Sequence, residues 1–156
     1  MENYQNKFMS LALLEAKKAA KEDEVPIGCV IVKDNKVISK GHNKREAKND
    51  VTSHAEIEAI RKASKKLNDW QLVDCELYVT IEPCLMCMGA IAQSHIKKVH
   101  YGSEDPKGGA VISSMKFEEI KNLNHKPEIQ GGILKEECSQ ILKDYFANKR
   151  KNKRLG

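Results

Sequence analysis

The stretch CELYVTIEPCLMCMGAIAQS, residues 75–94, indicates the fold more clearly than any other part of the chain. Its first half is an apolar run typical of a buried strand, and its second half is typical of a helix. Pro83 suits the junction because proline at a helix start has no N–H to leave unpaired. The junction also carries Cys84 and Cys87, but no second Cys-x-x-Cys pair occurs to complete a closed zinc site. The pair is therefore part of an open metal site or a redox pair.

Outward from this stretch, hydrophobic spacing and turn residues predict the other elements. A strand hairpin turns at Asp34-Asn35, and the polar segment 44–50 is expected to be a loop. Expected helices cover residues 3–22, 54–67, 115–122 and about 134–156, and expected strands cover 27–33, 36–43, 97–102 and 128–130.

The order of elements after the hairpin is helix, strand, helix, strand, helix. Such alternation favours a sheet with parallel strands and helices on both faces. No repeat or interdomain linker interrupts the sequence, so we expect one domain over residues 1–156 that ends in a basic helix from about residue 134.

The charge of the chain is concentrated at its C-terminal end. The sequence has 27 Lys and Arg against 22 Asp and Glu, and residues 143–154 contain six of the basic residues and one Asp. The rest of the chain is neutral, so this tail is either a solvated helix end or a phosphate-binding surface. No secretory signal and no apolar stretch of about 18 residues is present, which predicts a cytoplasmic protein without a membrane partner.

A third metal ligand is available in SHAEIEA, where His54 opens a predicted helix, as Cys84 and Cys87 open another. Side chains on first turns can reach an ion beyond the helix end, and helix N-termini favour the thiolate form. Three protein ligands leave one tetrahedral position for water, which is typical of catalytic rather than structural zinc. Glu56 is the candidate proton carrier, although its spacing from His54 does not establish that both side chains face the site.

His-x-Glu followed by Pro-Cys-x-x-Cys resembles the signature of zinc nucleobase deaminases. Together with VHYGSEDPKGGA and DYFANKRKNKR, it resembles the bacterial tRNA-specific adenosine deaminases of the TadA type over nearly the whole chain. The resemblance implies a cytidine-deaminase-like three-layer α/β/α sandwich with a central mixed five-stranded sheet. It also implies a homodimer with one Zn²⁺ per subunit, and a tRNA anticodon stem-loop bound near the subunit junction.

The implied reaction converts the wobble adenosine of a tRNA-Arg anticodon to inosine and releases ammonia. Zinc-bound hydroxide would attack C6 of the base. Glu56 would shuttle protons from water to N1 and then to the departing amine.

The resemblance also assigns substrate contacts. Asn43 would read the flipped adenine, although it is also a suitable turn residue at the end of the hairpin. Val25, Pro26 and Ile27 would wall the base pocket, a role compatible with simple core packing.

Further contacts would come from a loop and from the basic tail. The loop residues Asp105 and Lys107 would touch the anticodon backbone, where adjacent glycines permit close approach. The tail residues that would hold the stem-loop are Tyr145, Phe146, Lys149 and Arg150. The two aromatic residues could equally anchor the helix by packing.

Two other functions remain open at this point. A deaminase of free guanine or cytidine would share the zinc core but would gain nothing from the basic tail. A zinc-dependent RNA-binding protein without catalysis would have no use for Glu56. The remaining cysteines, Cys29, Cys75 and Cys138, lie in apolar contexts and are expected to be buried small hydrophobic residues.

Overall fold

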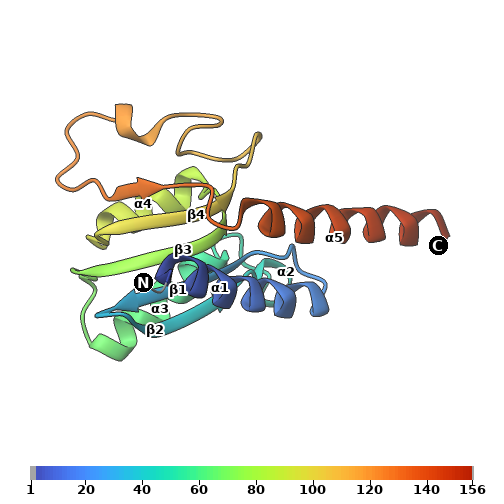
Figure 1. The fold of residues 1–156 in the computed structure, drawn as a ribbon, viewed down its shortest axis with the longest axis horizontal. Helices are drawn as coiled ribbons and strands as arrows, with labels where there is room; N and C mark the ends of the chain where they lie inside the picture. The colour runs from blue at the N-terminus through green and yellow to red at the C-terminus, as the bar shows by residue number, and fades with distance from the viewer. Residues whose placement is uncertain (1–2, 156) are drawn as a thin grey trace.

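A five-stranded mixed sheet forms the centre of the protein (Figure 1). The computed structural model describes residues 3–155. The strand order is β2-β1-β3-β4-β5, with β1 antiparallel to both its neighbours and β3, β4 and β5 parallel to one another. The strands are β1 (Gly28–Lys33), β2 (Lys36–His42), β3 (Cys75–Ile81), β4 (Lys98–Ser103) and β5 (Glu128–Gln130).

Helices cover both faces of this sheet. The helices α1 and α5 contact each other and pack on one face, whereas α3 and α4 contact each other and cover the other face. The helices are α1 (Tyr4–Lys21), α2 (Arg45–Lys48), α3 (Ala55–Leu67), α4 (Leu85–Gln93) and α5 (Lys135–Leu155), with a 3₁₀ helix η1 (Phe117–Glu119). The expected three-layer α/β/α arrangement with a mixed five-stranded sheet is therefore confirmed.

The two faces have separate hydrophobic cores because side chains alternate along each strand. In β1, Cys29 and Ile31 point to the core beneath α3 and α4, and Val30 and Val32 point to the core beneath α1. Cys29, Cys75 and Cys138 are all buried in these layers, as the sequence predicted.

Two glycines let helices approach the sheet closely at one end. A Cβ at Gly28 of β1 would overlap backbone atoms of Ala12 and Ala16 in α1. A Cβ at Gly41 of β2 would lie 2.6 Å from the carbonyl oxygen of Ala55, in α3 on the other face. At this end of the sheet, both helices therefore pack almost directly on strand backbone.

Four strand ends meet at that same edge. Gly28 at the start of β1 pairs with His42 at the end of β2, and Ile81 at the end of β3 pairs with Ser103 at the end of β4. In sheets with parallel strands, the segments that follow carboxyl ends are the usual place for a site.

Two expectations about local structure were wrong. Segment 44–50 is not simply a loop, because residues 45–48 form the short helix α2. Its first amides donate to Glu24, a distant carboxylate that supplies the cap: Glu46 N lies 3.0 Å and Ala47 N 2.7 Å from its oxygens. The helix expected over 115–122 is only the three-residue η1, whose N-cap residue makes no side-chain capping bond.

One buried histidine lies within the sheet. His100 of β4 is 1% exposed and stacks on Tyr78, with ring centroids 4.1 Å apart. Its Nε2 lies 2.8 Å from Glu76 Oε1, and Lys98 is the other charged group acting on it. Burial lowers the pKa of His100, with Glu76 opposing and Lys98 reinforcing the shift. No helix among residues 3–155 is long and apolar enough to cross a bilayer.

Candidate active site

The three predicted ligands lie at the starts of two helices. His54 is the N-cap residue of α3 and Cys84 is the N-cap residue of α4, both with extended backbone, and Cys87 is in the first turn of α4. Neither N-cap side chain caps its own helix. Both side chains are therefore free to bind something beyond the helix end.

The spacing of the three donor atoms fits zinc. His54 Nδ1 lies 3.6 Å from the Sγ atoms of both Cys84 and Cys87, and all three donor atoms lie within 4.8 Å of one another. A tetrahedral ion with Zn–S of about 2.3 Å and Zn–N of about 2.0–2.1 Å separates its nitrogen and sulfur ligands by about 3.6 Å. Among the described residues, this is the one group of three potential ligands gathered so closely.

The electrostatics of the two cysteines favour a thiolate. A hydrogen bond from the Cys87 thiol, reinforced by His54, lowers the pKa of Cys84 to about 4. The same contact, together with burial, raises the pKa of Cys87, and the hydrogen bond to Cys84 raises the pKa of His54. These contacts favour the thiolate form of Cys84, which is the form that metals require.

Glu56 is buried beside this group, at 2% exposure. His54 precedes the helix with extended backbone, so the two side chains are not held at the opposed positions of a regular helix. Cys84, His54 and Cys87 all act on the carboxyl group of Glu56. Burial, the largest influence, raises the pKa of Glu56 to about 7, a value suited to a group that both accepts and returns a proton near neutral pH.

The residues expected to hold the base adjoin the metal group. Asn43 N donates to Ile27 O at 3.1 Å. The next residue, Lys44, donates its backbone N–H to Ser53 O at 2.9 Å, and Ser53 directly precedes His54. Asn43 is 5% exposed, and its Oδ1 accepts a long hydrogen bond of 3.4 Å from Arg45 N. Beside it, the wall expected from residues 25–27 has a buried Pro26 between two half-buried residues.

The loop expected to contact RNA adjoins the start of α4, which carries Cys84. We call residues 104–114 the site loop. It touches the first ligand of α4 directly, because Cys84 and Gly109 form a β-bridge and Ala110 N donates to Pro83 O at 2.8 Å. Asp105 is half-buried in this loop and Lys107 is exposed.

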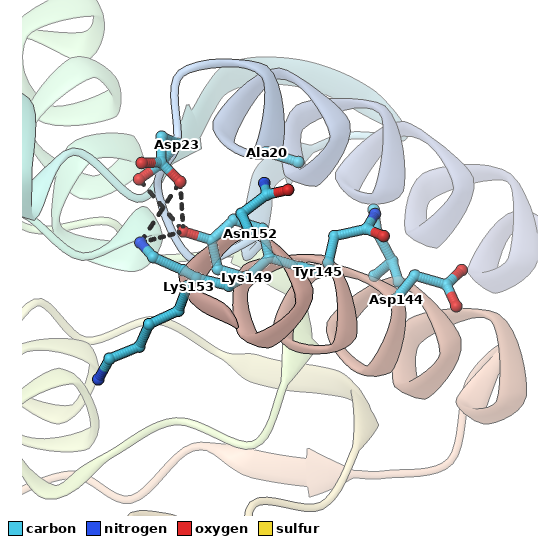
Figure 2. Close-up of a pocket in the computed structure, with 9 residues that line it drawn as sticks. Ala20, Asp23, Asp144, Tyr145, Lys149, Asn152 and Lys153 are labelled. Atoms are coloured by element: carbon cyan, nitrogen blue, oxygen red, sulfur yellow. Dashed lines mark hydrogen bonds and ion pairs between the residues drawn. The ribbon is translucent and has the colours of Figure 1, made fainter. Parts of the chain in front are cut away.

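One face of the basic tail packs against the end of α1. Tyr145 and Lys149 line a cavity of about 640 Å³ between α1 and α5, whose lining includes none of the three metal ligands (Figure 2). Tyr145 Oη lies 3.0 Å and Lys149 Nζ 3.4 Å from Asp23 Oδ1, and Lys149 also donates to Tyr145 Oη at 3.1 Å. Asp23 is two residues from Val25 in the sequence, so this face of the tail adjoins the segment expected to wall the base.

Another face of the tail adjoins the site loop. Phe146 and Arg150 line a second cavity, of about 310 Å³, together with Ser103 and Glu104 at the end of β4. Phe146 is 42% exposed and meets Tyr145 edge to face, with ring centroids 5.3 Å apart. The tail residues named from the sequence are thus divided between two sides of α5, each adjoining a segment that flanks the metal group.

Sequence reasoning missed three acidic residues around the site. Asp23 holds the tail, Glu24 caps α2, and Glu82 binds the site loop. Glu82 stands out in the sequence only as an acid between an apolar strand and Pro83, and its partners, 23 to 31 residues further along the chain, carry no pattern that points to it. The three predicted ligands, by contrast, were identified from helix-start patterns and from the resemblance to the signature of zinc nucleobase deaminases.

Comparisons with known proteins match almost the whole chain. The pattern of the MafB19-like deaminase family matches residues 3–150. A tRNA-specific adenosine deaminase of Agrobacterium fabrum is 46% identical over 143 residues, which cover 92% of this chain and 94% of the relative.

Two solved structures are also similar. One, from a study of A-to-I editing by tRNA:A34 deaminases at the wobble position of transfer RNA, superposes with a TM-score of 0.85 at 46% identity, covering 87% of this chain and 99% of the other. The other is a guanine deaminase from Bacillus subtilis, with a TM-score of 0.62 at 34% identity over 78% of this chain and 87% of the other. The match to the first is better in identity and in superposition.

Proposed function

The chain belongs to the tRNA-specific adenosine deaminases, a family of enzymes, and on that premise we propose that it deaminates the wobble adenosine A34 of a tRNA-Arg anticodon to inosine. The observation that carries the proposal is the meeting of a zinc-compatible ligand group, a buried Glu56 and a basic helix at one edge of the sheet. A tRNA substrate is also the reason to place the enzyme in the cytoplasm.

His54, Cys84 and Cys87 would hold one zinc ion per subunit, with the fourth tetrahedral position left to water. When bound, the ion supplies a Lewis acid that lets water act as a nucleophile near neutral pH. The neighbouring helix N-termini support the negative charge of the sulfur ligands.

Glu56 would move the protons of the reaction. Its carboxylate accepts a proton from the attacking water and delivers it to N1 of the adenine, while the water oxygen bonds to C6. The second proton of the water then passes to the exocyclic amine, which leaves as ammonia, and C6 retains the oxygen. Because Glu56 is buried, it exchanges protons with the substrate rather than with bulk water.

Asn43 would bind the edge of the flipped base, where an amide offers both a donor and an acceptor. Among the described residues, no hydrogen bond from its Nδ2 occupies the donor side. Val25, Pro26 and Ile27 would pack on the base, and the backbone bond between Asn43 and Ile27 couples the two parts of this pocket.

The RNA backbone would be held from two sides. Asp105 and Lys107 extend from the site loop, and the tail supplies Tyr145, Phe146, Lys149 and Arg150. Exposed cations on α5 bind phosphates and release counterions, so affinity for the stem-loop should fall as salt rises. A deaminase of free bases would have no need of this helix, which favours RNA over free guanine.

A homodimer is part of the proposal. Three apolar side chains near the ligands in the sequence or in the site loop are exposed: Val51 by 71%, Leu85 by 56% and Ile112 by 43%. Exposed apolar side chains beside a site are candidates for a subunit interface. Light scattering on the purified protein measures the mass, and a monomer at micromolar concentration would contradict this part.

The function is tested by incubating the zinc-loaded protein with mixed tRNA and locating inosine by sequencing. We expect one modified wobble position, in tRNA-Arg, and one zinc ion per chain by metal analysis. A parallel incubation with free guanine tests the rival activity. Rapid deamination of guanine without inosine in tRNA would refute the proposal.

A further inference from the structure

Glu82 is a buried carboxylate without a part in the chemistry described above. It lies between the end of β3 and the N-cap of α4, is 1% exposed, and its backbone N donates to Ser103 O at 2.8 Å. Burying a carboxylate is costly unless donors surround it. The donors that surround Glu82 therefore show what its position serves.

All the hydrogen-bond donors to Glu82 belong to the site loop. Its Oε1 accepts from Asp105 N at 3.1 Å and from the Ser113 hydroxyl. Its Oε2 accepts from the backbone N–H groups of Val111 and Ile112, both at 2.9 Å, and of Ser113 at 3.0 Å. One side chain thus gathers both ends of the loop at a single point.

The loop is shaped to fit against this carboxyl group. A Cβ at Gly109 would overlap the carboxyl carbon and oxygens of Glu82, so glycine permits the close approach. Within the loop, Asp105 Oδ1 accepts from Lys107 N and Gly108 N, each at 3.2 Å. The hydrogen bond from Asp105 N to the Glu82 carboxylate holds the backbone of Asp105. Because the Asp105 side chain binds Lys107 N, this bond also sets the position of Lys107.

This anchoring matters because the connection between β4 and β5, residues 104–127, contains only the short helix η1. Connections longer than about 12–15 residues are uncommon unless they have a function or are held in place. Here the part of the connection that Glu82 binds also carries Gly109, which forms a β-bridge with Cys84. The hydrogen bonds fix the exposed part of the loop relative to the metal group.

We infer that Glu82 is a positioning residue for RNA: through its five hydrogen bonds it holds Asp105 and Lys107 where they meet the substrate backbone next to the base at the metal group. The inference rests on the proposed function. It assigns Glu82 to the binding of RNA, not to the retention of zinc or the transfer of protons. Glu82 contacts no metal ligand side chain among the hydrogen bonds of the described chain.

The test compares Glu82→Gln with wild type and with Glu76→Gln, which removes a carboxylate from the far end of β3, the strand that precedes Glu82. A glutamine places N–H groups against N–H donors, so the loop should loosen. We expect hydrogen exchange at Val111, Ile112 and Ser113 to become at least about tenfold faster. For an anticodon stem-loop, KM should rise about tenfold with kcat little changed, the pattern of lost binding.

Zinc content is measured on the same samples and should stay at the wild-type value. Faster exchange with an unchanged KM would overturn the inference, as would unchanged exchange. Loss of zinc, or a fall in kcat with KM unchanged, would also overturn it, because Glu82 would then serve the metal group. A wild-type protein that forms no inosine would contradict the proposed function instead, and the exchange measurement separates the two results.

A milder variant guards against misfolding. Ser113→Ala removes the hydroxyl donor and keeps the three backbone donors to Oε2, so the fold should survive. We expect a smaller rise in KM in the same direction, and Glu82→Asp, which retains the charge, should recover part of the loss. A Ser113→Ala protein with wild-type exchange and a raised KM would contradict positioning through Glu82.

Discussion

Replacing Glu56 by glutamine tests the proposed chemistry most directly. The change exchanges one carboxylate oxygen for an NH₂ group of similar size, so packing around the residue is preserved. None of the three metal ligands is altered, and zinc should remain bound at one ion per chain. What is lost is the ability to accept a proton from water and return it to the base.

The size of the effect follows from burial. General acid–base catalysis contributes about 10²–10⁴-fold to a rate. Glu56 is 2% exposed, so bulk water has little access to take over the proton transfers. One carboxylate also serves two transfers in the proposed reaction. We therefore expect kcat to fall by at least about 10³-fold, or about 4 kcal/mol in the activation free energy.

Glu58→Gln is the matched control. Glu58 lies two residues further along α3 and is equally buried at 3% exposure, but it pairs with Lys48 at 2.7 Å and Arg61 at 3.2 Å instead of the metal group. Its replacement should lower the melting temperature and leave kcat unchanged. Single-turnover inosine formation on a stem-loop, with metal analysis of each sample, measures both variants.

Three outcomes would refute the reasoning. Wild-type turnover in Glu56→Gln would show that another group moves the protons. Loss of zinc from that variant would show that Glu56 supports the metal, so that a fall in activity would not report on proton transfer. Equal loss of kcat in Glu58→Gln would point to a general effect on α3.

Three other changes probe the ligands, the buried histidine and the tail. Cys84→Ala removes a proposed ligand, so the purified protein should contain less zinc and form no inosine; full zinc occupancy by metal analysis would exclude Cys84 as a ligand. Burial lowers the pKa of His100 below 6.5, so the unfolded chain binds more protons than the folded protein as the pH falls below that value. The free energy of unfolding therefore decreases with falling pH, by up to about 1.4 kcal/mol for each pKa unit between the folded and unfolded states. Urea titrations near pH 7.5 and near pH 5.5 should show a smaller decrease in His100→Gln, and equal decreases would refute this. Asp23→Asn frees Tyr145 and Lys149 and removes a negative charge from the proposed RNA surface, so KM for the stem-loop should fall about two- to fivefold at low salt and less at high salt. An unchanged Kd in filter-binding assays, with an unchanged KM in kinetic assays, would show that Asp23 does not compete with RNA.

The layers of the fold could be predicted because they depend on local patterns. Apolar strands, turn residues and helix periodicity place the sheet and its covering helices without knowledge of distant contacts. The ligand group could be predicted for the same reason. His54 and Cys84 each begin a helix after a strand or loop, and this arrangement brings both helix starts to one edge of the sheet.

The failures have non-local causes. The helix α2 is capped by Glu24, more than 20 residues away, and nothing within segment 44–50 announces that partner. Around Phe117, apolar residues suggested a longer helix, but Phe117 alone is buried in η1 and no capping side chain starts it. The site loop likewise takes its shape from Glu82, whose partners adjoin it only in the folded chain.

The close packing at Gly28 and Gly41 has a consequence for how the protein adapts to its substrate. The two glycines lie on neighbouring strands, and α1 and α3 press on them from opposite faces at the edge that carries the metal group. Close-packed layers deform little, so this edge is a stiff frame. Accommodation of the proposed RNA substrate then falls to the rim, to the exposed turns of α5. Substrate range can therefore evolve at the rim while the frame keeps the chemistry constant.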